Sequence, residues 1–267
     1  MKGTYLLFDI GATHTRLGVS KTGKKVDGMI VFATPKNFND GITSIKKHAL
    51  LLCGQKIASS AGGIAGPLNQ EKTKVINAPN LPGWNGKELV SELKKITRGR
   101  VVLENDNTIV GLGEAIYGAA KNYSIVVYYT FSTGVNGIRV VNGKVEPSAF
   151  GVEAGHQLIA TDKTLFDLAS GAALKRKYKN SLHEIKDRRI WDGVEKSIAL
   201  GLYNSILHWS PEVVVLGGGL MKSVSLSNVK RHLKKQMKIF KQLPEIKKAA
   251  LGDLNGLYGA LELLKQK

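Results

Sequence analysis

The sequence predicts an α/β protein made of two similar halves, each combining a sheet with helices. The chain has 267 residues and is 43% hydrophobic, which is enough to bury one large core or two smaller ones. Its first part reads as three strands, a helix, a strand, a helix, a strand and a helix. The pattern FDIGATHTRLGV, a strand, a turn of small residues and a strand, then returns as TFSTGVNGIRVV. This repeat predicts two lobes with a ligand cleft between them.

The elements of the first half follow from the spacing of its apolar residues. Strands are predicted over 5–10, 15–20, 28–34, 56–65 and 101–103. One helix is predicted from a shared apolar face, formed by Ile42, Ile45, Ala49, Leu52 and Cys53. A second is predicted from Leu89, Leu93 and Ile96. Asn85 and Glu88 have the spacing of a capping box, so this helix is expected to begin after Asn85.

The second half is predicted to begin with another group of strands. These are 124–131, GIRVV and KVEP, and the last two are joined by an Asn142-Gly143 hairpin turn. Helices follow within 163–178 and 191–209, then a buried strand over 213–216 that ends in three glycines. A lysine-rich helix and a last helix near 254–264 complete the pattern.

The net charge of +18 is concentrated in residues 222–248, where nine Lys or Arg face one acid, Glu245. Apolar residues recur there at helical spacing: Leu226, Val229, Leu233, Met237 and Phe240. The lysines are therefore interpreted as the outer face of an amphipathic helix, and a polyanion-binding surface is the alternative. Nucleic acid is not an expected partner, because no zinc-finger or helix-turn-helix signature is present.

The N-terminus and the cysteine content indicate a cytoplasmic protein. The apolar stretch in MKGTYLLFDIGAT is too short for a signal peptide, and no run approaches the length of a membrane span. The one cysteine, Cys53, excludes an internal disulfide and a multi-cysteine zinc site.

Three turns rich in small residues are candidate phosphate or nucleotide sites. In DIGAT, residues 9–13, backbone N–H groups can approach a phosphate, and Asp9 can hold magnesium through water. STGVNG, residues 132–137, is the equivalent turn of the second half. LGGGLM, residues 216–221, follows a buried strand. Each turn alone is equally consistent with an ordinary hairpin or strand-to-helix connection.

Two further stretches carry candidate catalytic and binding side chains. In GVEAGH, Glu153 and His156 are three residues apart and can point into one pocket. In LENDN, residues 103–107, acids and amides follow a strand, so Asp106 either caps the next helix or accepts a proton. Glu104 is expected to face the opposite way from Asn105 along the strand.

Taken in order, these residues resemble the ROK sugar-kinase family of the actin-like, hexokinase-type ATPase superfamily. DIGATHTR and STGVNG are similar to its two phosphate motifs, and LGGG to its adenosine-side turn. IAGP, NAPNLPGW and LENDN resemble its sugar-side segments, EAGH its E-x-G-H element, and FDLASGAAL the stretch that follows. The resemblance covers nearly the whole chain.

The resemblance implies two ribonuclease-H-like lobes of the actin or hexokinase type. The smaller would comprise residues 1–108 and about 253–267, and the larger 109–252. It also implies a homodimeric kinase that uses ATP and magnesium to phosphorylate glucose or a related hexose or amino-hexose, at the 6-hydroxyl. A repressor of the same family is not expected, because only eight residues precede Asp9.

The resemblance also implies roles for individual residues. Asp106 falls on the catalytic base, and Asp9 on the acid that organises magnesium through water. The expected sugar contacts are Gly66, Asn80, Asn105, Glu153 and His156. The expected nucleotide and phosphate contacts are Asp9, Gly11, Thr13, Thr133, Gly134 and Gly218.

The chain departs from the family pattern at several positions. Ala12 and Asn136 replace glycines, and Phe166 stands where a sugar-contact glutamate usually lies. The cysteines that follow E-x-G-H in many members are missing, so no zinc site is expected beside His156. Two alternatives therefore stay open: a glucokinase that uses polyphosphate, and a sugar sensor without catalytic activity.

Overall fold

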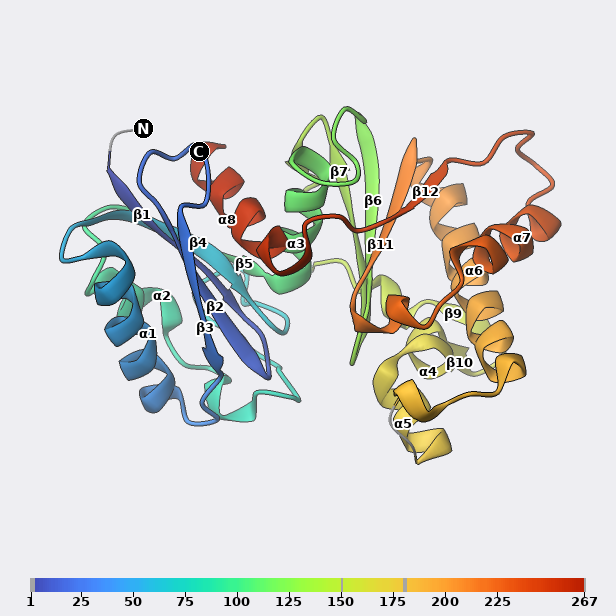
Figure 1. Cartoon of the computed structure of the whole chain (residues 1–267), viewed down its shortest axis with the longest axis horizontal. Helices are drawn as coiled ribbons and strands as arrows, with labels where there is room; N and C mark the ends of the chain where they lie inside the picture. Colours follow the sequence, from blue (N-terminus) through green and yellow to red (C-terminus); the bar gives the residue numbers. More distant parts are fainter. Residues whose placement is uncertain (1–2, 150, 180–181, 267) are drawn as a thin grey trace. The chain divides into compact units, whose positions relative to one another are not determined.

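A computed structural model describes residues 3–149, 151–179 and 182–266 (Figure 1). The chain divides into two compact units. The first comprises Met1–Tyr117, Ala149–Gly151 and Leu251–Lys267, and the second Gly118–Ser148 and Val152–Ala250. These limits differ from the sequence-based division at 108/109, because that boundary cuts through a helix that belongs wholly to the first unit. In the described ranges, no helix is both long enough and apolar enough to span a bilayer.

The first unit is built on a five-stranded sheet of order β3-β2-β1-β4-β5. β1 pairs antiparallel with β2, and β2 with β3, whereas β4 lies parallel to β1 and β5 parallel to β4. The strands are β1 (Thr4–Ile10), β2 (His14–Ser20), β3 (Gly28–Ala33), β4 (Ile57–Ile64) and β5 (Val101–Asn105). All five strands predicted for this half are confirmed within a few residues.

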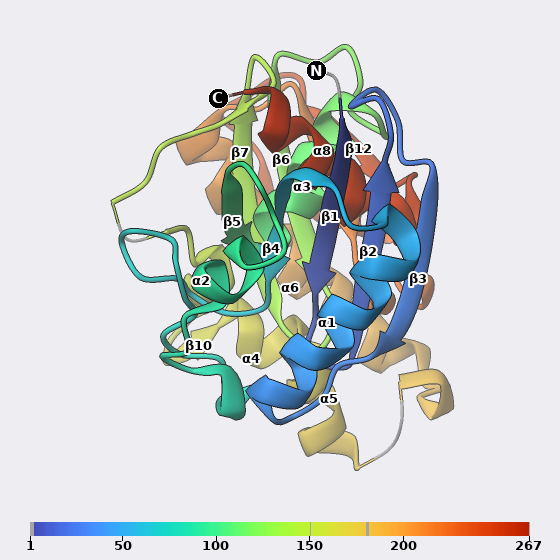
Figure 2. The same cartoon turned by 90° about the vertical axis from the view of Figure 1, so that its left-hand side faces the viewer.

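Two pairs of helices cover the two faces of this sheet. They are α1 (Phe38–Cys53) and α2 (Leu89–Lys94) on one face, and α3 (Asp106–Ile116) and α8 (Asn255–Lys265) on the other (Figures 1 and 2). The predicted apolar face of α1 is confirmed, since Ile42, Ile45 and Ala49 are buried in one core with Leu6 and Phe8 of β1. α8 comes from the end of the chain and packs along α3, so the C-terminus closes the first unit.

The second unit repeats this topology. Its sheet has the order β12-β11-β6-β7-β8, in which three antiparallel strands are again followed by two parallel ones. The strands are β6 (Ile125–Phe131), β7 (Val135–Val141), β8 (Lys144–Val145), β11 (Val213–Gly217) and β12 (Glu245–Lys248). β7 and β8 form the predicted hairpin, and Asn142 and Gly143 both adopt positive φ in its turn. The repeat read from the sequence is therefore confirmed at the level of strand order.

Besides three short 3-10 turns, the described residues of the second unit contain four further helices and a short hairpin. They are α4 (Leu165–Ala169), α5 (Gly171–Tyr178), α6 (Arg188–Trp209), α7 (Leu226–Gln236), β9 (Leu158–Ala160) and β10 (Lys163–Thr164). The helix predicted within 163–178 is interrupted at Ser170, which has extended φ and ψ and caps α5 through its side chain. α6 and α7 pack together, and Leu202, Val229 and Leu233 lie in the core with Val127 and Tyr129 of the sheet.

Two local predictions are wrong. Asn85 does not cap α2, because its Oδ1 accepts the backbone N–H of Ala78 at 2.7 Å and the helix begins only at Leu89. The lysine-rich helix does not reach Phe240: α7 ends at Gln236, and the Phe240 side chain is 42% exposed. The strand β12 then pairs with β11, a tertiary contact that the helical spacing of residues 226–240 could not reveal.

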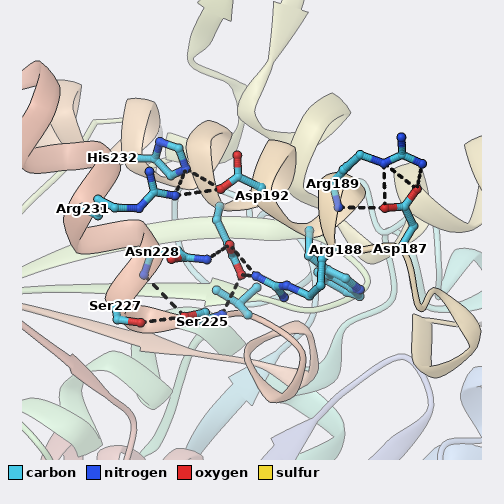
Figure 3. Close-up of polar contacts among 12 residues, drawn as sticks. Asp187, Arg188, Arg189, Asp192, Ser225, Ser227, Asn228, Arg231 and His232 are labelled. Carbon is cyan, nitrogen blue, oxygen red and sulfur yellow. Dashed lines mark hydrogen bonds and ion pairs between the residues drawn. The ribbon is translucent and has the colours of Figure 1, made fainter.

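A polar cluster holds α6 against the segment that begins α7 (Figure 3). Glu195 of α6 is fully buried, and its carboxylate accepts hydrogen bonds from Arg188 Nη2 at 3.1 Å, Ser225 N at 2.8 Å and Asn228 Nδ2 at 2.9 Å. Nearby, Asp192 accepts hydrogen bonds from Arg231 and His232 at 2.9 Å each. A buried carboxylate is tolerated only when its oxygens are satisfied in this way.

We expect Arg188→Ala to lower the free energy of unfolding by about 1–3 kcal/mol, because it removes the cation that neutralises the buried Glu195. Arg189→Ala is the matched control. The Arg189 side chain is 92% exposed and pairs with Asp187, two residues earlier, so a change below about 0.5 kcal/mol is expected. Chemical denaturation of both variants measures the difference. Equal effects would show that Glu195 does not depend on Arg188.

Candidate active site

The first part of the candidate site lies where β1 ends. Asp9 is 8% exposed and is paired in register with Arg16 of β2 and Gly63 of β4. Arg16 Nη1 lies 3.8 Å from Asp9 Oδ2, and Arg16 Nη2 lies 2.6 Å from Oδ1 of Asp253. A side chain at Gly256 would begin 2.9 Å from Asp9 Oδ2, so the Asp9 carboxylate packs directly against the first turn of α8.

The surroundings of Asp9 disfavour its negative charge. Burial, then the nearby charge of Asp106, raises the pKa of Asp9 to about 7, and Arg16 only partly offsets this. A buried carboxylate close to a second carboxylate is an arrangement that a cation would relieve. Both groups are hard oxygen donors, which suit Mg²⁺ with most of its water shell retained. In the part of the chain that the structure describes, no three His, Cys, Asp or Glu side chains form a metal-ligand cluster.

The turn after Asp9 is fixed by hydrogen bonds of its backbone. Gly11 N donates to His14 O at 3.0 Å, and Gly11 O accepts from Thr34 Oγ1 at 2.7 Å. Thr13 O accepts from Thr34 N at 2.9 Å, and the Thr13 side chain is exposed. Lys36 Nζ lies over the same turn, 3.1 Å from Ala12 O. The turn is therefore a rigid loop edged by a cation, which is suited to an anionic group.

Asp106 is the first residue of α3, and the cap of this helix is Asn105. Asn105 Oδ1 accepts from Asn107 N at 2.9 Å, and Asp106 Oδ1 accepts from the same N–H at 2.8 Å. Helix capping thus falls mainly to Asn105, while the shared N–H fixes one oxygen of the Asp106 carboxylate. Glu104, one residue earlier, forms an ion pair with Lys72.

Two further predicted sugar contacts lie in the loops of the first unit. Gly66 has a φ of +115°, and its carbonyl accepts from Asn105 Nδ2 at 3.0 Å. Asn80 is exposed, and its carbonyl lies 3.5 Å from Lys36 Nζ, the amine that also contacts Ala12. Within the first unit the structure therefore joins Asn105 to Gly66 directly, and Asn80 to the DIGAT turn through Lys36.

In the second unit, Thr133 and Gly134 form the turn between β6 and β7. The beginning of α5 holds this turn, since Ala172 N donates to Thr133 O at 3.1 Å. Gly218 follows β11 with a φ of +93°. A side chain there would begin 2.3 Å from Phe131 O, so the Gly218 turn lies against the end of β6 and requires glycine. The two predicted nucleotide turns of this unit therefore meet at the end of β6.

Glu153 precedes a short 3-10 turn, Ala154–His156, that ends with His156 and packs on β7. A side chain at Gly155 would begin 1.9 Å from Val135 O, so only glycine allows this approach. The His156 ring is stacked on Phe166, with centroids 5.8 Å apart and planes at 7°. Surrounding protein raises the pKa of Glu153 by displacing water, and the charge of His156 opposes this rise. The structure therefore brings Glu153 and His156 within electrostatic reach of one another.

The sequence reading missed several residues that surround these positions. In the first unit they are Arg16, Lys36, Asp253 and Gly256, and in the second unit Gln157. Asp253 and Gly256 lie some 240 positions after Asp9 along the chain, so no local pattern connects them to it. No local sequence pattern distinguishes Lys36 from the other lysines of the chain.

Comparisons with known proteins match this chain over most of its length. The ROK family model matches residues 5–267. A glucokinase from Thermotoga maritima is 28% identical over 258 residues, which covers 80% of this chain and 81% of that protein. An N-acetyl-D-glucosamine kinase from Histophilus somni is 28% identical over 306 residues and covers 97% and 98% of the two chains.

Among solved structures, a ROK hexokinase from Thermus thermophilus matches with a TM-score of 0.86 at 26% identity, over 99% of each chain. The fold class predicted from the sequence is confirmed, with two sheets of the same strand order in one α/β chain. The chain therefore has the fold class of the hexokinase-type α/β proteins. The chain belongs to the ROK family.

Proposed function

We propose that this ROK-family sugar kinase transfers the terminal phosphoryl group of ATP to a hexose, at the 6-hydroxyl, with Asp106 as general base. The observation that carries the proposal is the placement of Asp106. Its carboxylate is fixed by a hydrogen bond at the first turn of α3, close enough to the buried Asp9 for its charge to raise the pKa of Asp9. A proton acceptor close to a cation-binding carboxylate is the pair that phosphoryl transfer to a hydroxyl needs.

In the proposed reaction the sugar hydroxyl oxygen forms a bond to the terminal phosphorus while the bond from that phosphorus to the bridging oxygen of ADP breaks. The hydroxyl proton passes to Asp106. Magnesium, when bound, would neutralise phosphate charge, and Asp9 would hold it through its water shell. Backbone N–H groups of the turns that contain Gly11, Thr13, Thr133 and Gly134 would hold the phosphates, and Gly218 would adjoin the nucleoside.

The sugar would be oriented by five residues in the two units. Asn80, Asn105 and the Gly66 loop would contribute from the first unit, and Glu153 and His156 from the second. Asn105 Nδ2 bonds only Gly66 O among the described residues, and an amide nitrogen has two donors, so one proton is available for a sugar hydroxyl. A cytoplasmic homodimer is the expected form, which light scattering tests.

The experiment is ADP release with ATP, magnesium and one sugar at a time. The panel is glucose, mannose, fructose, N-acetylglucosamine and N-acetylmannosamine, with a reaction without sugar as background. Sugar-dependent ADP release by at least one member supports the kinase. If no sugar raises ADP release above background while calorimetry detects sugar binding, the chain is a sensor and the proposal is wrong.

A polyphosphate donor is the second candidate, and the basic surface at the end of α7 and in the segment after it, residues 234–241, is the observation that favours it. Lys234, Lys235, Lys238 and Lys241 are exposed and form no ion pair with any residue that the structure describes. We expect ATP to be the better donor, since exposed lysines at a helix end and in the loop after it are explained as solvated surface. Initial rates with ATP and with polyphosphate at 50 and 200 mM salt decide, because polyanion binding weakens steeply with salt.

A further inference from the structure

The turn that carries Glu153 and His156 is held by a side chain of the neighbouring strand. Asn136, in β7, points its Oδ1 at two backbone N–H groups, Ala154 N at 3.0 Å and Gly137 N at 2.8 Å. The second bond fixes the amide on its own strand. The first joins that strand to the residue between Glu153 and Gly155.

The same turn is held from the opposite side by Gln157. Its Nε2 donates to Ala154 O at 2.8 Å and to the hydroxyl of Tyr129 at 3.0 Å. Its Oε1 accepts from Asn204 Nδ2 at 2.9 Å, and Tyr129 is itself bonded to Ser205 at 2.6 Å. Both ends of the Gln157 amide are thus tied to β6 and α6, and Ala154 is bonded through its N–H and through its carbonyl.

Asn136 also lies close in the chain to the proposed phosphate turn. Asn136 is two residues after Gly134, so one short segment, residues 133–136, carries both the proposed phosphate turn and the anchor of the sugar turn. The contact between Gly155 and Val135 brings the two turns together, but a van der Waals contact does not orient them, because it has no preferred direction. The hydrogen bond from Ala154 N to the Asn136 amide oxygen is directional and can orient the turn.

We infer that Asn136 is a positioning residue: it fixes the sugar-binding turn relative to the phosphate-binding turn through Ala154 N. This rests on the proposed function, since it takes Glu153 and His156 as sugar contacts. Without the Asn136 acceptor, Ala154 N–H loses its partner, and the turn is held by Gln157 and by the packing of Gly155 on Val135. Glu153 and His156 then lose their fixed placement, whereas the Thr133–Gly134 turn keeps its bonds to the start of α5.

The test compares four proteins: wild type, Asn136→Ala, Asn136→Asp and Glu212→Ala. Asp keeps an oxygen at the accepting position and is the conservative variant. Glu212 is the matched control, because its carboxylate also accepts two backbone N–H groups, Ser124 N at 2.6 Å and Ile125 N at 3.1 Å, at the opposite end of β6. Steady-state rates give KM for the sugar and for ATP separately, and circular dichroism checks folding.

For Asn136→Ala we expect KM for the sugar to rise about 10- to 100-fold, the effect that a small misplacement of binding groups produces, while KM for ATP changes less than threefold. Asn136→Asp restores the sugar KM to within about threefold of wild type, and Glu212→Ala changes neither KM. The inference is overturned if Asn136→Ala leaves the sugar KM unchanged, if both KM values rise together, or if Asp restores nothing.

Gln157→Ala provides a second test if Asn136→Ala does not fold. It removes the hold on Ala154 O and is expected to raise the sugar KM in the same selective way; an unchanged sugar KM would contradict the inference. Failure of the proposed function looks different, because wild type itself then shows no sugar-dependent ADP release. In that case calorimetry of sugar binding to wild type and Asn136→Ala decides, with equal affinities counting against the inference.

Discussion

Asp106→Asn is expected to lower kcat for sugar phosphorylation by about 100- to 10,000-fold, the usual contribution of a general base. The substitution preserves the shape of the side chain and leaves an oxygen to accept Asn107 N–H, but an amide cannot accept the hydroxyl proton. The loss of a negative charge at the helix start costs only about 0.3–1 kcal/mol of stability. Steady-state kinetics and thermal unfolding measure the two effects.

Glu104→Gln is the control for this prediction. Glu104 is two residues away in the chain, it is also an acid, and its carboxylate pairs with Lys72. We expect its kcat to stay within about threefold of wild type. Near-wild-type turnover by Asp106→Asn, or an equal loss in both variants, would remove Asp106 from the mechanism.

Asp9→Asn is expected to make the substrate-free protein more stable at pH 8 than wild type. The pKa of Asp9 is about 7 in the folded protein and 3.8 in the reference state, so between these values the folded state holds the extra proton. The free energy of unfolding therefore falls as the pH rises from about 4 to 7, and levels off above. One pKa unit corresponds to about 1.4 kcal/mol, so ionisation of Asp9 lowers the free energy of unfolding by an amount on the order of 3 kcal/mol between pH 5 and 8.

Urea unfolding at pH 5 and pH 8, without nucleotide or magnesium, measures this difference. The stability lost by wild type should exceed that lost by Asp9→Asn by the stated amount. Asp187→Asn is the control, because hydrogen bonds from Arg189 lower the pKa of this acid below its ordinary value, so its titration lies below the pH range of the experiment. Parallel losses in wild type and Asp9→Asn would mean that Asp9 is ionised in the substrate-free protein.

The fold was largely predictable because each sheet begins with local structure. Strands β1 to β3 and β6 to β8 are joined by short connections, and their apolar alternation and turn residues are visible in the sequence. The predicted residues also fall at element ends, with Asp9 near the end of β1 and Asp106 at the start of α3. Their proposed roles in catalysis still depend on the variants described above.

Predictions from local sequence patterns were wrong where the same residues were compatible with more than one structure. Asn85 has the spacing of a cap, but a loop N–H, that of Ala78, takes its side chain instead. Phe240 continues a helical spacing by chance, and β12 forms because β11 offers a parallel edge with which it can pair. Backbone groups bond to the partner that the fold brings near, and sequence spacing alone does not identify that partner.

The sequence by itself determined the α/β class, the repeat, the family and the positions of the candidate acids. Only the tertiary structure decided what surrounds those acids. Asp253 and Gly256 reach Asp9 because α8 returns from the end of the chain to pack along α3, and Asn136 reaches Ala154 because Gly155 lets the turn approach β7. The physical reason is range: turns and strands follow from neighbouring residues, whereas charge, burial and hydrogen-bond partners follow from residues that only folding brings together.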